Sequence, residues 1–198
     1  AREQLRSGVE DALKALGQGF LAENANHAVR QRLAGGELSP HDYFQQLLRL
    51  VYRLIFLLTI EERGLLHPDD ADPQALRLYQ DGYSLRRLRE RARRRRAWDK
   101  HADLWQCLKP VFAGLASGQP LLALPALGGL FATDQCPDLD SAELGNSALL
   151  GAVAKLAWMH SDGSLTRINW RDMGPEELGS VYESLLELVP VIGSDNRQ

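Results

Sequence analysis

The spacing of apolar residues predicts one strongly hydrophobic helix in the first half of the chain. It begins at Ser39, a good N-cap, continues with Pro40, which suits the first helical position, and ends at Gly64, which suits a left-handed stop. From Leu50 onward, apolar side chains fall on nearly every side of this helix. A helix without a polar face needs neighbours on most sides, so we expect it to lie at the centre of a helical bundle.

Amphipathic segments flank this helix on both sides. The N-terminal segment places apolar residues on one helical face, at Leu5, Val9, Leu13, Leu16 and Phe20. Shorter helices are predicted at 24–34, 76–82, 85–96, 98–115, 146–157 and 175–189. Ser84 and Asn146 are the expected caps of two of them. Pro110 should kink or restart the helix in which it lies.

The stretch 118–140 lacks helical periodicity and is rich in Gly, Pro and Asp, yet it is markedly apolar. We therefore expect an ordered loop packed on the bundle. A brief extended segment is predicted at 165–170, with no second strand to pair with it. Together these features predict an all-α fold, an irregular bundle of about seven or eight helices around a buried central helix, with one long ordered loop.

The predicted organisation is a single helical domain over residues 1–190. It comprises N-terminal helices at 1–36, the central and basic helices at 39–118, the loop at 119–145 and C-terminal helices at 146–190. Residues 191–198 are expected to be a frayed tail that leads toward a missing downstream domain. The chain begins at Ala1 without a methionine, so we expect it to be an excerpt of a longer protein.

Charge is unevenly distributed along the 198 residues, although the net charge is only −3. Residues 86–100 hold nine basic and two acidic residues, whereas 134–198 hold eleven acidic and four basic ones. The two cysteines have no close partner in sequence, which favours a reduced, cytoplasmic protein. The apolar run at 50–60 is too short to span a bilayer and contains Arg53, so no membrane association is expected.

The arginine run is the strongest candidate for a binding site. If the helix extends through it, Arg86, Arg89, Arg93 and Arg96 share one side, and Arg87, Arg91 and Arg94 share another. Guanidinium groups at this density suit sequence-independent contacts with phosphates. The candidate nucleic-acid-binding residues are Arg86, Arg87, Arg89, Arg93, Arg94, Arg95 and Arg96. The alternatives are a solvated helix face, or pairing with acidic residues of the C-terminal half.

Other candidates carry weaker signals. A buried Arg53 would need a partner from elsewhere in the chain, as in a fixed interdomain ion pair. The favoured reading is that its stem packs and its charged end reaches solvent. Gly128-Gly129 predicts a structural turn more than a phosphate cradle, because no Lys-Ser/Thr-capped helix follows. His101 and Asp103 point to different faces of a helix, so no metal site is predicted. The four tryptophans favour core or interface roles over base stacking.

Four blocks of sequence resemble the helical region that precedes the catalytic domain of large adenine-specific DNA methyltransferases. These enzymes belong to bacterial restriction–modification and phage-defence systems, and they include fused type IIG enzymes. The blocks are LVYRLIFLLTIEERGLL, YSLRRLR, LPALGGLF and NWRDMGPEELGSVYESLLELVP. The matching features are the acidic-Arg-Gly turn at 61–64 and the Leu-Gly-Ser-x-Tyr-Glu helix at 178–187. The Pro-x-x-x-Gly-Gly-Leu-Phe loop of the family has its counterpart at Pro125 to Phe131, which is one residue shorter between Pro125 and Gly128. The resemblance covers roughly 39–190.

The resemblance implies a non-catalytic domain. The cofactor-binding glycine motif and the Asn-Pro-Pro-Tyr/Phe loop of the family do not occur in this sequence, so no catalytic or cofactor-binding residue is predicted. The parent protein would transfer a methyl group from S-adenosylmethionine to adenine N6. This chain would brace the downstream methyltransferase domain, with Tyr182 and Glu183 as positioning residues, and contact DNA. The alternative is a stand-alone helical interaction module whose basic helix binds an acidic partner protein; a small helical enzyme is a third reading.

Overall fold

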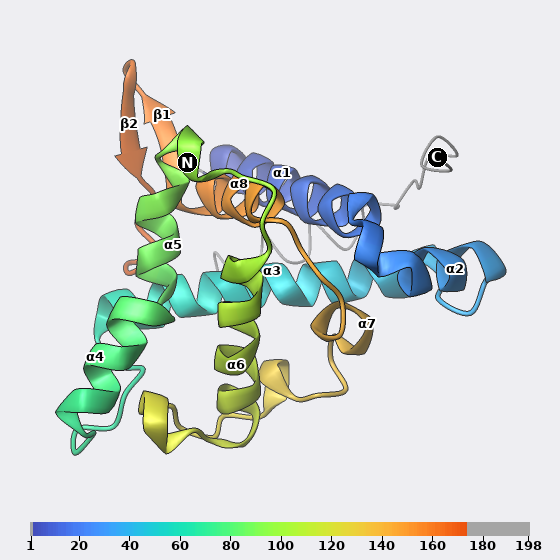
Figure 1. Ribbon diagram of the computed structural model, residues 1–198. Coiled ribbons are helices and arrows are strands. Elements are labelled where there is room, and N and C mark those ends of the chain that lie inside the picture. Colours follow the sequence, from blue (N-terminus) through green and yellow to red (C-terminus); the bar gives the residue numbers. More distant parts are fainter. Residues whose placement is uncertain (1, 174–198) are drawn as a thin grey trace.

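The long helix α3 (Pro40–Arg63) runs through the middle of the structure, as its apolar pattern predicts (Figure 1). Both predicted ends are confirmed: the Ser39 hydroxyl accepts a hydrogen bond from the Asp42 amide at 3.0 Å, and Gly64 has a φ of 66°. By length and composition alone, α3 could cross a membrane, but 67% of its most apolar window is buried inside the protein. That burial is typical of a core helix.

The computed structural model describes residues 2–173, and the fold over this range is the predicted all-α bundle. The other α-helices are α1 (Arg2–Ala22), α2 (His27–Gly35), α4 (Pro73–Gly82), α5 (Leu85–Ala92), α6 (Asp103–Ser117), α7 (Pro137–Asp140) and α8 (Asn146–Ala157). Short 3-10 turns lie at Asn24–Asn26, Arg95–Ala97, Pro120–Leu122 and Gly129–Phe131. The predicted helix at 175–189, with Tyr182 and Glu183, and the tail at 191–198 lie outside the described residues.

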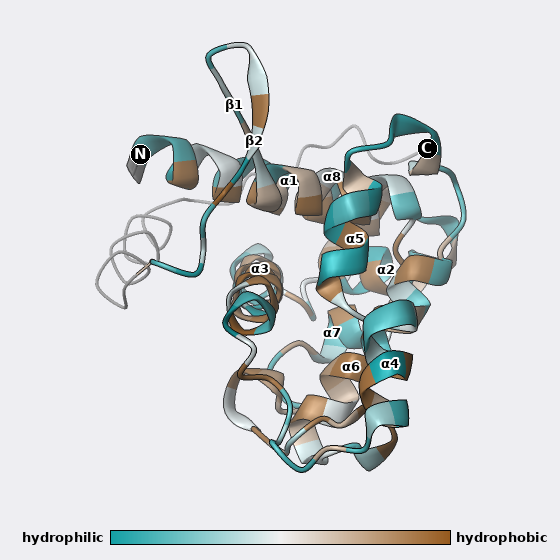
Figure 2. Cartoon of the chain, turned by 90° about the vertical axis from the view of Figure 1, so that its left-hand side faces the viewer, coloured by the Kyte–Doolittle hydropathy of each residue, from teal (hydrophilic) through white to brown (hydrophobic). Residues whose placement is uncertain are grey.

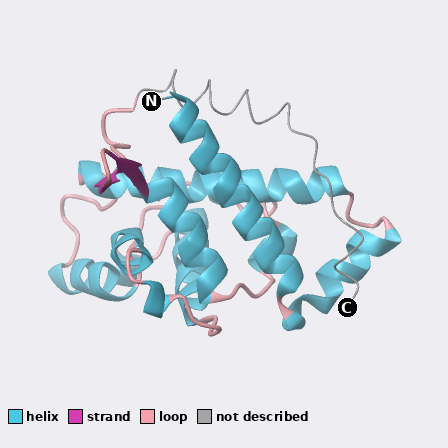
Figure 3. Cartoon of the chain, turned by 90° about the horizontal axis from the view of Figure 1, so that it is seen from above, coloured by secondary structure: helices cyan, strands magenta, loops and turns pink. Residues whose placement is uncertain are grey.

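Helices α1 and α8 lie side by side across α3 (Figure 3). Glycines of α1 make this close approach possible. A Cβ at Gly8 would lie 2.6 Å from the Lys155 carbonyl oxygen, and one at Gly19 would overlap Ala148. The sequence pattern identified the apolar stripe of α1, but it did not identify these two contact points, because glycine contributes nothing to a hydrophobic period.

The predicted ordered loop wraps around the buried side chain of Arg53. The guanidinium of Arg53 is fully buried and donates to the carbonyl oxygens of Leu130 (2.8 Å) and Ala132 (3.3 Å), and to the Asp140 carboxylate (2.9 Å). It also lies over the rings of Phe112 and Phe131, with centroid distances of 5.0 and 5.7 Å. The partners therefore come from elsewhere in the chain, and the favoured prediction, in which the charged end of Arg53 reaches solvent, is wrong.

A short β-hairpin corrects the prediction that no second strand exists. Strand β1 (Trp158–Ser161) pairs antiparallel with β2 (Ser164–Arg167), and the hairpin projects from the bundle (Figure 1). Asp162 and Gly163 form the turn with φ angles of 51° and 78°. Two positive φ angles in a two-residue loop are typical of hairpins, and Asp-Gly is a preferred sequence for them. The signal was present at 162–163, but four-residue strands are too short to show a clear alternation.

Two details of the predicted helices also differ. Asn146 does not cap its own helix; instead its Oδ1 accepts the Leu104 amide at 3.2 Å and so caps α6. Its side-chain amide donates to Asp99 and Asp103 at 2.7 and 2.9 Å. Pro110 does not restart a helix, because α6 continues from Asp103 to Ser117 with Pro110 inside it.

Replacing Arg53 should be strongly destabilising. We expect Arg53→Met to lower the free energy of unfolding by about 3–5 kcal/mol, because it leaves Asp140 and two carbonyl groups without their donor. Arg49→Met on the same helix is the control. It removes a single hydrogen bond, to the Gln135 carbonyl, and should cost about 1 kcal/mol. Urea unfolding followed by circular dichroism measures both, and equal costs would contradict the central role of Arg53.

Candidate nucleic-acid interface

The arginine run is not one continuous helix. Helix α5 ends at Ala92, Arg94 is extended, and Arg95–Ala97 form a 3-10 turn. Trp98 explains this end: its indole N–H donates to the Ala92 carbonyl at 3.1 Å, and its ring packs over Gly151 of α8. The prediction of a helix through Arg96 is therefore wrong, and so are the helical faces assigned to Arg93, Arg94 and Arg96.

Arg89 is a structural residue rather than a surface cation. It is only 4% exposed, and its Nη1 donates to the Glu62 carboxylate at 2.8 Å. Its backbone carbonyl also accepts the indole N–H of Trp158 at 3.0 Å. Burial lowers the pKa of the Arg89 guanidinium, and the positive charge of Arg167 lowers it further. Arg89 thus joins α5 to the end of α3 and is not part of the exposed basic surface of this run.

Arg87 is half-buried and is also a poor candidate for a surface contact. Its Nε atom is buried, with no hydrogen-bond partner among residues 2–173. Burial lowers the pKa of Arg87, as does the neighbouring charge of Arg91, while Cys107 and Asp103 on α6 act in the opposite direction. Its side chain therefore lies toward the contact between α5 and α6.

The acidic turn at the end of α3 holds the start of α5 in place. Glu61 accepts hydrogen bonds from the Tyr79 hydroxyl (2.7 Å) and from the amides of Leu85 (2.8 Å) and Arg86 (2.9 Å). Together with Ser84, whose hydroxyl accepts the Arg87 amide as predicted, it caps α5. Burial raises the pKa of Glu61, and the hydrogen bonds that it accepts oppose that rise.

The exposed basic residues form a strip where the chain leaves α5. The residues Arg93, Arg94, Arg95 and Arg96, here called the basic strip, are all exposed, and so are Arg86 and Arg91 within α5. The hydrophilic colouring of α5 in Figure 2 reflects the same composition. Arg93 lies over the Trp158 ring at 4.8 Å and Arg95 over the Trp98 ring at 4.2 Å. Stacking on indole faces orients these two guanidiniums without neutralising their charge.

Acidic residues of the C-terminal half do not neutralise the basic strip within the described part of the chain. Asp138 pairs with Arg32, Asp140 with Arg53, and Glu143 with Lys109. Within the strip, only Arg93 has a carboxylate nearby, that of Glu90 at 3.6 Å. For residues 2–173, therefore, internal charge matching does not explain the strip.

The remaining candidates have structural roles. Gly128 and Gly129, with φ angles of 60° and 51°, form the turn that leads the loop to Arg53. Trp105 and Trp170 are buried, and their indole N–H groups donate to the carbonyls of Ala142 and Leu156. Asp103 accepts a hydrogen bond from Asn146, which lowers its pKa. No group of residues suited to hold a metal ion occurs among residues 2–173.

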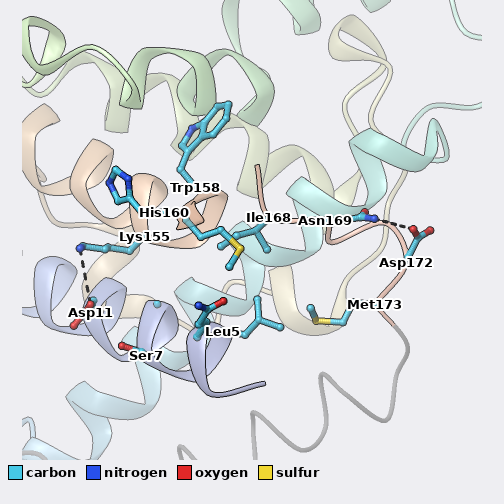
Figure 4. Close-up of a pocket in the computed structure, with 13 residues that line it drawn as sticks. Leu5, Ser7, Asp11, Lys155, Trp158, His160, Ile168, Asn169, Asp172 and Met173 are labelled. Carbon is cyan, nitrogen blue, oxygen red and sulfur yellow. Dashed lines mark hydrogen bonds and ion pairs between the residues drawn. The ribbon is translucent and has the colours of Figure 1, made fainter. Parts of the chain in front are cut away.

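A mainly apolar hollow lies between α1, the hairpin and the chain after β2 (Figure 4). Leu5, Trp158, Ile168 and Met173 line it, and the Lys155–Asp11 ion pair lies at its edge. Sequence analysis did not identify this hollow, because its lining comes from three separate segments. Met173 is the last described residue, so the segment predicted to be helical at 175–189 follows directly in the sequence.

Comparison with known proteins identifies no relative. No family model matches the chain, and neither a search of curated proteins nor one of solved structures found a similar protein.

Substitutions of structural arginines in the run should lower the free energy of unfolding more than substitutions of exposed ones. We expect Arg89→Gln to lower the free energy of unfolding by roughly 3 kcal/mol, since it leaves the nearly buried Glu62 with only the longer contact to Arg167. Arg94→Gln is the matched control, with an expected change below about 0.5 kcal/mol. Guanidinium chloride unfolding distinguishes the two. Similar stabilities would mean that Arg89 does not anchor α5.

Proposed function

We propose that this chain is a non-catalytic helical domain of a bacterial adenine-specific (N6) DNA methyltransferase from a restriction–modification or phage-defence system. In this proposal it acts in the cytoplasm, braces the downstream methyltransferase domain of the same protein and contacts DNA phosphates through exposed arginines. The S-adenosylmethionine cofactor would bind to the parent protein outside this chain. The proposal rests on the four sequence blocks that resemble that region of these enzymes.

The way in which the blocks meet supports a bracing role. Arg53, in the first block, is surrounded by the Pro125–Phe131 block through the Leu130 carbonyl and the Phe131 ring. Glu61, at the end of the first block, caps the helix of the second, and Arg63 donates to the Arg171 carbonyl in the fourth. Three blocks distant in sequence are thereby fixed to one helix, as a rigid support for a neighbouring domain requires.

The observation that carries the DNA-contact proposal is the basic strip itself. Its four guanidiniums are exposed, and acidic residues of the described chain approach only one of them. Unpaired, exposed arginines contribute to DNA binding by displacing counterions from the phosphate backbone, which makes binding weaker as salt increases. Nothing in the strip is placed to recognise bases, so we expect no sequence preference.

The test is a salt series of binding to a labelled random-sequence DNA duplex. We expect wild-type binding to weaken steeply with salt. Arg94→Gln/Arg96→Gln should weaken binding and reduce the slope of log K against log salt by about 2, since each phosphate contact contributes about 0.9. These two arginines are chosen because Arg93 and Arg95 also pack on tryptophans.

The matched control is Lys14→Gln/Arg77→Gln, which removes the same charge from exposed positions on α1 and α4. It should leave the slope nearly unchanged. Equal losses in both variants would mean that net charge, and not the strip, governs binding. Absence of binding at low salt by folded wild-type protein would overturn the DNA contact and favour the alternative, an acidic partner protein.

A further inference from the structure

Four arginines meet in a pocket at the C-terminal end of α3. They are Arg86 and Arg89 of α5, Arg167 of β2 and Arg171, which follows the hairpin. Leu58, Glu61 and Glu62 complete the lining of this arginine pocket, whose volume is about 330 Å³. The pocket shares no residue with the basic strip.

The two carboxylates of the pocket are already occupied by protein donors. Both oxygens of Glu61 accept hydrogen bonds from uncharged groups, the Tyr79 hydroxyl and two backbone amides. Glu62 is shared between two cations: its Oε1 lies 2.8 Å from Arg89 Nη1 and 3.7 Å from Arg167 Nε. Among residues 2–173, neither acid pairs with Arg86 or Arg171, because the contacts of Glu61 are to Tyr79 and two amides and those of Glu62 are to Arg89 and Arg167.

The guanidiniums, in contrast, are incompletely paired. The side chains of Arg86 and Arg171 are exposed and form no hydrogen bond or ion pair within residues 2–173. Arg89 is buried, yet only its Nη1 is hydrogen-bonded; its Nε has no acceptor and lies 3.9 Å from the Glu90 carboxylate. A buried guanidinium with an unsatisfied donor is costly in a folded protein. Four arginines and two glutamates leave a formal charge of +2.

The backbone segments that carry these arginines are held in place by hydrogen bonds. Glu61 fixes the start of α5, and the Arg89 carbonyl is tied to Trp158 at the start of β1. Two hydrogen bonds from Arg63, at 2.7 and 3.1 Å, hold the Arg171 carbonyl against the end of α3. Two regions distant in sequence, α5 and the stretch 164–171, therefore bring four arginines together on backbones that are held in place.

We propose that the arginine pocket binds a phosphate group. Planar guanidiniums donate paired hydrogen bonds to phosphate oxygens. A doubly negative phosphate or phosphomonoester would balance the charge of the pocket, and a singly negative phosphodiester would balance half of it. The phosphate would come either from a free phosphate or phosphomonoester, or from the backbone of a nucleic acid. The site does not depend on DNA contact by the basic strip.

Calorimetric titration of the full 198-residue chain with inorganic phosphate at low salt tests the proposal. We expect saturable binding of one phosphate to the wild type. Arg86→Gln/Arg171→Gln should weaken it at least about tenfold, since hydrogen bonds to charged groups are lost. These residues lack internal partners, so the variant should fold, which circular dichroism verifies. The matched control, Arg94→Gln/Arg96→Gln, removes the same charge from the basic strip and should bind phosphate within about twofold of the wild type.

A second readout locates the ligand at the pocket. In the wild type, the Nε–H signal of Arg89 in a nitrogen-correlated NMR spectrum should shift on addition of phosphate, because Arg89 lines the pocket. The shift should be absent in Arg86→Gln/Arg171→Gln and present in the control. No saturable phosphate binding by the wild type, or equal weakening in both double variants, would overturn the site.

A third titrant distinguishes the two sources of phosphate. Dithymidine joined by a single phosphodiester, without a terminal phosphate, represents the nucleic-acid backbone. If it shifts the Arg89 signal as phosphate does, the pocket takes a backbone phosphate; if only inorganic phosphate does so, the ligand is a free phosphate or a phosphomonoester. Both results support the pocket. The salt slope of DNA binding is changed through Arg94 and Arg96, so failure at either site can be recognised separately.

Discussion

The buried charge of Arg53 is the constraint on which the arrangement of this protein depends. A guanidinium in the middle of an apolar helix must have its donors satisfied, and water does not reach it, since its side chain is fully buried. The chain satisfies it with two carbonyl oxygens, one carboxylate and two aromatic faces, all from segments outside α3. The loop after α6 has no long helices of its own, and its contacts with the Arg53 guanidinium hold it in place. Gly128, with a backbone angle that other residues avoid, permits the turn that brings Leu130 within reach.

The end of α3 imposes a second constraint of the same kind. Its last turn presents Glu61, Glu62 and Arg63, and each of them fixes a different segment: the start of α5, the middle of α5 with β2, and the chain at Arg171. Charged side chains at the end of α3 thus hold neighbouring segments in place, as apolar contacts do along the length of the helix. The difference is that polar contacts require specific atoms at specific places, so they fix orientation as well as proximity. Under the proposed function, this property would suit a domain that supports a neighbour.

Much of the fold follows from local sequence, but the role of individual arginines does not. The caps of α3 were predictable, because Ser39 and Gly64 act within a few positions of the helix ends. The apolar composition of 118–140 predicted an ordered loop but not its contacts with Arg53. The end of α5 was not predictable, since it depends on Trp98 meeting Gly151 across more than fifty positions. Nor could the sequence distinguish Arg89 from Arg86, because both lie in one short basic helix and only tertiary contact places Glu62 beside one of them. The arginine pocket was hidden for the same reason: Arg167 and Arg171 lie far from the arginine run.

Because some of the arginines are buried or paired, the local positive charge at 86–100 overstates the number of guanidiniums available to contact phosphates. A count of basic residues treats all guanidiniums as equal, yet only an unpaired and exposed one can exchange its counterions for a phosphate. Arg89 is buried and paired with Glu62, and Arg87 is half-buried beside α6, so neither is an exposed, unpaired cation of the arginine run. Arg93 and Arg95 keep their charge but gain a fixed direction from the indoles beneath them. The electrostatic footprint is therefore smaller than the sequence indicates and more ordered, which favours contacts at defined positions over diffuse attraction.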